Sequence, residues 1–147
     1  MISHFLRSTV AAVACTAAIA FAGPAFAEMV NLKAQLNGAA EVPPNPTTAT
    51  GSVTATYDTA TKKLAWKGSY TGLSGPATAA HFHGPAEPGK NAGIAVPIFA
   101  GAAAKTPFEG EATLTDAQAS DLLAGKLYAN IHTEANKAGE IRGQLTK

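Results

Sequence analysis

Residues 78–85 read Thr-Ala-Ala-His-Phe-His-Gly-Pro, and this stretch indicates how the fold is built. Successive side chains of a β-strand point to opposite faces. His81 and His83 would therefore share one face, about 7 Å apart, while Ala80 and Phe82 would point into a core. A glycine and a proline follow directly, so the stretch predicts a strand that ends at a histidine.

A second stretch, residues 127–133, repeats the pattern as Leu-Tyr-Ala-Asn-Ile-His-Thr. Its aliphatic side chains would face the core, and Tyr128, Asn130 and His132 would share the opposite face. The only other histidine, His4, stands at the N-terminus. If the two strands are neighbours, three histidines meet on the polar side of the sheet.

A period of two continues through most of the remaining chain. Pro97 implies an edge strand or a bulge, and one short helix is expected from Thr115, where a capping box precedes an apolar side. Seven or eight short strands and one helix predict an all-β antiparallel β-sandwich or Greek-key barrel, immunoglobulin-like or superoxide-dismutase-like. Further strands are expected at residues 29–36, 52–57, 64–70, 94–98, 108–114 and 140–145.

The N-terminal residues 1–27 have the layout of a signal peptide. Arg7 precedes an apolar run over residues 10–22, and Ala25-Phe26-Ala27 supplies small residues for cleavage. Glycine and proline interrupt the run before the roughly 20 residues that a membrane span needs. We therefore expect residues 28–147 to form one exported domain, periplasmic or secreted, without a membrane span.

The charge balance argues against nucleic-acid partners, and the cysteine content argues against disulfides. The chain carries 11 Lys and Arg against 10 Asp and Glu, and losing Arg7 with the signal peptide would balance the two. This composition lacks the basic footprint typical of nucleic-acid partners. The single cysteine, Cys15, lies in the segment expected to be removed, so stability would come from packing without disulfides.

Several short motifs occur in a fixed order along the chain, at residues 36–38, 41–44, 49–51, 70–73, 80–85, 123–125, 128–133 and 139–145. Together they resemble the CHRD domain, a family named for the extracellular protein chordin and also found in secreted microbial proteins. The resemblance extends over the whole of residues 28–147. It implies an extracytoplasmic all-β domain and no particular activity.

The three histidines suggest a metal site. Neutral imidazoles suit zinc or copper, and a three-histidine site keeps a fourth position open for water or substrate. We therefore take His81, His83 and His132 as candidate ligands of copper or zinc. The alternative is that they hydrogen-bond to Asn130, Tyr128 and loop backbone, which would tie residues 84–91 to the sheet; the sequence leaves both interpretations open.

Three further polar residues are candidates for ligand binding. Tyr128 and Asn130 would share the face of His132, and Arg142 would lie on the polar face of the last strand. An arginine there can hold an anion or a partner's carboxylate. The simpler expectation for Arg142 is a salt bridge to Glu134 or Glu140.

Three functional hypotheses follow. The sequence favours a non-enzymatic binding module whose partner is a metal ion, an extracellular protein or a small ligand. The second is a copper- or zinc-dependent enzyme, because copper-zinc superoxide dismutase is a β-sandwich that carries a His-x-His pair; a bridging histidine and a second ligand set are missing here, and the analogy is one of fold. The third is a purely structural domain.

Overall fold

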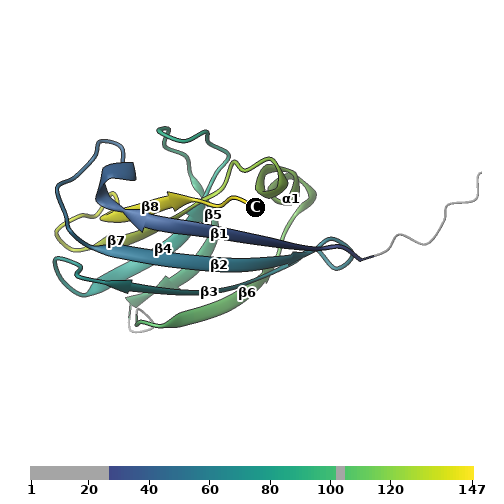
Figure 1. Cartoon of the computed structure of the whole chain (residues 1–147), viewed down its shortest axis with the longest axis horizontal. Helices are drawn as coiled ribbons and strands as arrows, with labels where there is room; N and C mark the ends of the chain where they lie inside the picture. Colours follow the sequence, from purple (N-terminus) through teal and green to yellow (C-terminus); the bar gives the residue numbers. More distant parts are fainter. Residues whose placement is uncertain (1–26, 102–104) are drawn as a thin grey trace, which may run out of the picture.

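The computed structural model describes residues 27–101 and 105–147 (Figure 1). Eight strands form one antiparallel sheet, which confirms the all-β prediction. The elements are β1 (Met29–Asn37), the 3₁₀ turn η1 (Gly38–Ala40), β2 (Thr50–Asp58), β3 (Lys63–Thr71), β4 (Ala77–His83), β5 (Ile94–Ala100), β6 (Phe108–Thr113), α1 (Asp116–Leu123), β7 (Tyr128–Thr133) and β8 (Ile141–Gln144).

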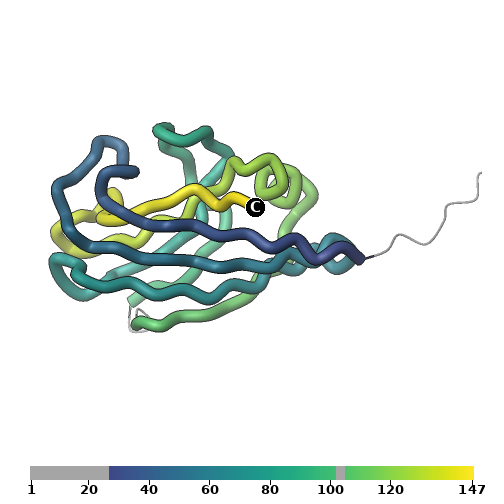
Figure 2. The backbone as a smooth tube through the Cα atoms, in the orientation of Figure 1, coloured from purple at the N-terminus to yellow at the C-terminus, as the bar shows by residue number. Residues whose placement is uncertain are grey.

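The sheet curls into a nearly closed barrel. Its strand order is β5-β4-β7-β8-β1-β2-β3-β6, and Figure 2 follows the chain around it, with β8 running beside β1. The chain makes a Greek-key connection, because β7 returns to pair with β4 after β5 and β6 have been formed. The strands that carry the two candidate histidine motifs, β4 and β7, are therefore direct neighbours.

The core is built by the alternation that the sequence predicted. In β1 every second residue is buried, from Val30 to Leu36. Trp66 of β3 meets Phe82 of β4 across the barrel, with ring centroids 5.3 Å apart in an edge-to-face arrangement. Such aromatic pairs add to the free energy gained by burial, so this contact joins the two halves of the barrel.

Aromatic side chains also close the seam between the two edge strands. Phe99 of β5 and Phe108 of β6 lie 5.2 Å apart between ring centroids, although β5 and β6 do not hydrogen-bond to each other. Pro97 lies in β5, at the edge of the sheet and next to register shifts in the β4–β5 pairing. The expectation of an edge position or a bulge is confirmed.

Helix α1 begins and ends as predicted. Thr115 and Gln118 form a reciprocal capping box, and Gly125 follows the helix with a φ of 71°. The Gln118 side chain also donates to the backbone oxygen of Ala95, 2.7 Å away. The helix is thereby fastened to β5, and its Leu122 is buried in the core.

The polar face of β4, β7 and β8 is covered by loops. All six residues of β7 are buried, so this strand is enclosed on both sides. Two of the covering loops, residues 38–49 in blue and 84–93 in teal, rise at the top of Figure 1 above β8. The candidate site therefore lies between the outer face of the sheet and a layer of loops.

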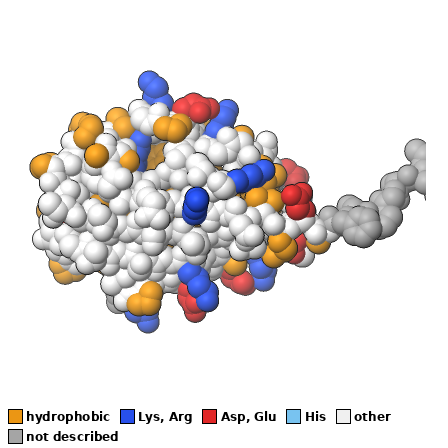
Figure 3. Space-filling model, viewed as in Figure 1, with side chains coloured by type: hydrophobic (Ala, Val, Ile, Leu, Met, Phe, Trp, Pro, Cys, Tyr) orange, Lys and Arg blue, Asp and Glu red, His pale blue; other side chains and the backbone are white. Residues whose placement is uncertain are grey.

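The visible surface carries charges of both signs without a single-sign patch (Figure 3). Exposed pairs such as Lys63–Glu111 and Lys67–Glu109 place opposite charges together on β3 and β6. Within residues 27–101 and 105–147 no helix is long and apolar enough to cross a membrane. The predicted signal peptide lies outside the described residues except for Ala27, so export stays a prediction.

Gly143 tests the close approach of β8 to β1. A Cβ atom added at Gly143 would lie 2.1 Å from the backbone oxygen of Gln35, which cannot move without disturbing the β1–β8 pairing. We expect Gly143→Ala to lower the free energy of unfolding by roughly 2 kcal/mol, in the range of overpacked sites. Urea denaturation measures it, with Gly75→Ala as the control, since a Cβ there meets nothing within 4 Å. Equal stabilities of the two variants would contradict the close approach.

Candidate metal centre

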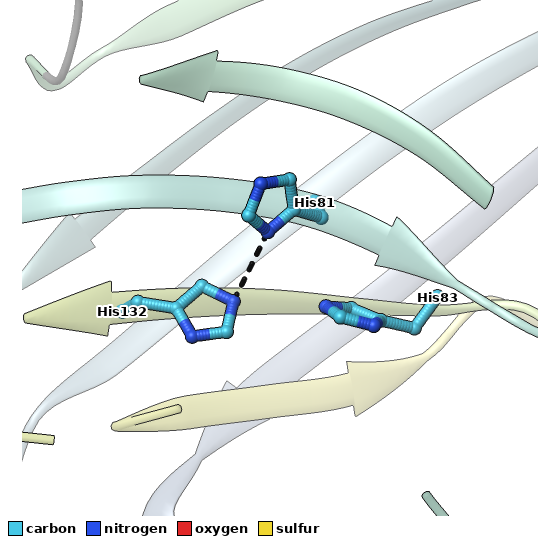
Figure 4. Close-up of side chains that lie close together, drawn as sticks. All are labelled: His81, His83 and His132. Atoms are coloured by element: carbon cyan, nitrogen blue, oxygen red, sulfur yellow. Dashed lines mark hydrogen bonds between the residues drawn. The ribbon is translucent and has the colours of Figure 1, made fainter. Parts of the chain in front are cut away.

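The pairing of β4 with β7 brings the three histidines together. His81 stands opposite Asn130, and His132 stands opposite Ala79. One ring nitrogen from each of His81, His83 and His132 lies within 4.8 Å of the other two, and Figure 4 shows the three rings around a common space. The expected meeting of the histidines on one face is what the structure shows.

Backbone carbonyls fix the orientation of two of the rings. His83 Nδ1 lies 3.1 Å from the oxygen of Ala92, and His132 Nδ1 lies 3.0 Å from the oxygen of Lys137. A carbonyl oxygen only accepts, so both Nδ1 atoms carry the proton and both Nε2 atoms present a lone pair. Metal-bound histidines commonly have this arrangement, in which one nitrogen is anchored and the other is free to coordinate.

The free nitrogens are only partly satisfied by the protein. His81 Nδ1 lies 3.2 Å from His132 Nε2 and donates to it (Figure 4). His83 Nε2 is buried and has no hydrogen-bond partner in the described part of the chain. Leaving a buried polar atom unpaired costs about 1–3 kcal/mol. A hydrogen-bond donor or a metal ion that accepted the lone pair of His83 Nε2 would remove this cost.

The distances suit a small metal ion. His81 and His132 would hold such an ion through the two nitrogens that lie 3.2 Å apart, once the His81 proton has moved from Nδ1 to Nε2. His83, whose ligand atom lies within 4.8 Å of the other two, would move closer to complete the set. The donor chemistry therefore fits zinc or copper.

Burial and neighbouring charges favour the neutral form of the three histidines. Burial is the main cause that lowers the pKa of all three histidines. Charge on His132 and His83 adds to this for His81, charge on His83 adds to it for His132, and the Arg142 guanidinium adds to it for His83. The imidazoles are therefore neutral at pH 7, the form that binds metal. His81 is partly exposed whereas His83 and His132 are buried, so solvent reaches the cluster from the His81 side.

Tyr128 and Arg142 support His83 from behind. The Tyr128 ring stacks on His83 with centroids 5.1 Å apart, and the Arg142 guanidinium lies 4.4 Å from the Tyr128 centroid. The Tyr128 hydroxyl accepts from the backbone N–H of Ala92, the residue whose oxygen holds His83. Tyr128 thus fixes both the ring of a candidate ligand and the loop beside it.

The predicted salt bridge of Arg142 to Glu134 or Glu140 is wrong. Arg142 is buried, and it donates to the backbone oxygen of Ala40 at 2.7 Å and to Asn91 Oδ1 at 2.9 Å. Glu134 pairs with Lys137 instead. Arg142 therefore fastens loops 38–49 and 84–93 to β8, which periodicity along one strand does not reveal.

Asn130 lies between the histidines and Arg142, opposite His81 on β4 and opposite Arg142 on β8. Its Oδ1 is buried without a hydrogen-bond partner among the described residues. Gly139, with a φ of 138°, packs on it so closely that a Cβ would lie 2.5 Å from the amide. The expected hydrogen bonds from the histidines to Asn130 are not found; loop carbonyls take that role for His83 and His132.

A cavity adjoins this network on the side of β1 and β8. Its volume is about 540 Å³, and both Glu41 and Arg142 line it together with Gln144. The three predicted ligand-binding residues thus lie on one buried face, with Arg142 between the histidine cluster and the cavity. Their role in binding stays a prediction.

Sequence reasoning did not identify Glu41 as part of the site. Its carboxyl is buried, and Oε1 has no hydrogen-bond partner within the described ranges. Burial raises the pKa of Glu41 to about 7, although Arg142 and the Asn130 amide act in the opposite direction. The three prolines that follow it indicate an irregular connection, in which no periodicity shows the side to which a residue points.

Glu140 is the second buried carboxyl and has the opposite environment. Its oxygens accept from the Thr47 hydroxyl, the Ser74 backbone N–H and hydroxyl, and the Thr133 hydroxyl. Burial would raise the pKa of Glu140, but these hydrogen bonds outweigh it and lower the pKa to about 2. Glu140 is therefore an ionised structural anchor that joins the end of β7 to the loops that carry Thr47 and Ser74.

The comparison with known families identifies the family of the chain. The model of the CHRD domain matches residues 32–145, which include every residue of the candidate site. The chain belongs to the CHRD family, and the resemblance found in the sequence is confirmed. Searches of curated proteins and of solved structures find no match.

Removing the Glu140 charge tests the anchor. Glu140→Gln replaces one carboxylate oxygen, which accepts hydrogen bonds, by an NH₂ group, which donates them. The four donors around this side chain then lose part of their acceptor, so we expect the free energy of unfolding at pH 7 to fall by roughly 3 kcal/mol. The low pKa of Glu140 stabilises the fold above its unfolded value of 4.5, and this contribution fades as the pH falls toward 2. Denaturation at several pH values measures it, with Glu109→Gln at an exposed site as control; a deficit that persists at pH 2 would contradict the mechanism.

Glu41 gives the opposite pH dependence. Its raised pKa means that the protonated form fits the fold, so stability is complete below the unfolded pKa of 4.5 and declines as the pH rises through about 7. We expect Glu41→Gln, which stays neutral, to be more stable than the metal-free wild type by roughly 2 kcal/mol at pH 8.5. In thermal denaturation the stabilities of the two proteins should become equal near pH 4.5. A difference that stays the same at every pH would contradict a raised pKa of Glu41.

Proposed function

We propose that this CHRD domain is a metal-binding module that holds copper or zinc through His81, His83 and His132. The observation that carries the proposal is the convergence of three neutral ring nitrogens within 4.8 Å, one of them buried without a partner. A bound ion would accept the His83 lone pair and replace the weak His81–His132 hydrogen bond.

The anchoring hydrogen bonds support binding as well as structure. The bonds from His83 and His132 to loop carbonyls are also what a purely structural role would require. They use only Nδ1, however, and leave Nε2 directed into the cluster. Because these bonds already restrain both rings, little side-chain entropy is lost when His83 moves the remaining distance to an ion.

The fourth coordination position would face the solvent side of the cluster. With three protein ligands, a water molecule or a donor from a partner completes a tetrahedral site. In the described part of the chain no second group of histidine, cysteine or carboxylate ligands forms a cluster of this kind. We therefore propose binding rather than dismutase-like redox chemistry.

The proposed setting is outside the cytoplasm. The family is named for an extracellular protein, and residues 1–27 have the layout of a signal peptide. In a periplasm or secreted fluid the domain would meet metal ions, extracellular proteins and small ligands. Loops 38–49 and 84–93 border the site and offer the surface for such partners.

Titration of tag-free protein with Zn(II) and Cu(II) by calorimetry tests the proposal. We expect one ion per chain, and a loss of at least a hundredfold in affinity when His81→Ala and His83→Ala are combined, because two of three ligands are gone. His132→Ala alone should also weaken binding strongly; unaltered affinity would remove it from the ligand set.

The control is Thr54→Ala on the exposed face of β2, which should bind as the wild type does. No binding at micromolar metal would refute the proposal and leave the histidines with the structural role alone. Binding that survives the double substitution would place the metal elsewhere.

A further inference from the structure

Two buried acceptor atoms next to the histidine cluster have no hydrogen-bond partner in the described chain. They are Glu41 Oε1 and Asn130 Oδ1, and the Asn130 amide is close enough to Glu41 to influence its ionisation. Because Glu41 Oε1 has no donor among the described residues and is shielded from water, an ionised Glu41 would carry a poorly compensated buried charge. A proton on the carboxyl removes that charge while the site is empty.

The same face lacks a counter-charge for a metal ion. Three neutral imidazoles contribute no negative charge, and the buried Arg142 guanidinium already adds a positive one that acts on His83. Glu140 is fully engaged by its four donors. A buried ion needs compensation by opposite charge, and Glu41 is the buried carboxyl left to supply it.

We propose that Glu41 is the proton-exchanging counter-charge of the three-histidine site: it holds a proton while the site is free of metal and releases it to solvent when a divalent ion binds. The inference rests on the proposed metal binding and adds its regulation by pH. The proton would leave through the cavity of about 540 Å³ that Glu41 lines.

The size of the effect follows from Coulomb's law. Asn130, whose amide lies near Glu41, stands directly opposite His81, and neighbouring strands are about 4.8 Å apart. Two strand spacings, roughly 10 Å, therefore serve as the scale of the distance between Glu41 and the cluster. At an effective dielectric constant of about 20, a double positive charge at that distance favours the ionised carboxyl by roughly a hundredfold. A group that is half protonated at pH 7 would lose nearly all of its proton.

The other charged and polar groups around Glu41 come from β7, β8 and a neighbouring loop. They are the Arg142 guanidinium and the uncharged Gln144 side chain of β8, and the uncharged Asn130 side chain of β7. Lys137, which shares a smaller cavity with Glu41, is paired with Glu134 at the surface. The histidines beyond Asn130 are already neutral at pH 7, so their contribution to proton release is small.

Calorimetric titration with Zn(II) in buffers of different ionisation enthalpy counts the protons released. At pH 7 we expect the wild type to release about half a proton more per ion than Glu41→Gln. The affinity ratio of the two proteins should rise by at least tenfold between pH 5 and pH 7. Glu109→Gln, which removes an exposed carboxylate, should release as many protons as the wild type.

A second measurement needs no substitution. The side-chain carboxyl ¹³C shift of Glu41 reports its titration in the wild type by NMR, and Zn(II) should move its midpoint down by at least one pH unit. Zinc binding with an unmoved midpoint, or with equal proton release from wild type and Glu41→Gln, would overturn this inference and leave the metal site standing. Absence of zinc binding to the wild type would overturn the metal site, and this inference with it.

Discussion

The burial of β7 on both faces is the constraint on which the rest of the structure depends. One face of this strand meets the aliphatic core, and the other carries Tyr128, Asn130 and His132 beneath a layer of loops. Buried polar groups require hydrogen-bond partners from the protein. The loops therefore adopt the paths that bring carbonyls such as those of Ala92 and Lys137 to the ring nitrogens.

The same constraint gives the two buried glutamates opposite properties. Glu140 is surrounded by hydroxyl and amide donors and is ionised, so it fastens loops. Glu41 is buried with one carboxyl oxygen lacking a hydrogen-bond partner among the described residues, so it keeps its proton more readily. Three of the four buried side-chain atoms without partners in the described residues lie on this face, and the fourth, Trp66 Nε1, is in the core. Unsatisfied polar groups are thus concentrated where the three histidines converge.

Membership of the CHRD family and the β-barrel do not by themselves specify an activity, because one fold supports many functions. The chemistry open to this domain is set by the residues of the site. Its histidines belong to adjacent strands of a rigid sheet, and Tyr128 and Arg142 hold one of them in place from behind. A rigid scaffold with fixed ligands is what selective metal binding requires, and a bound ion would link β4, β7 and the loops that cover them.

The sequence by itself determined the strands, the capped helix, the family and the shared face of His81 and His83, because each depends on local alternation or on contiguous motifs. His132 joins His81 and His83 only because β4 pairs with β7, and this pairing is a property of the tertiary structure. The partners of Arg142 and the burial of Glu41 were also decided there. Loop residues have no periodicity, and their environment is set by segments up to a hundred positions away, as the bond from Arg142 to Ala40 illustrates.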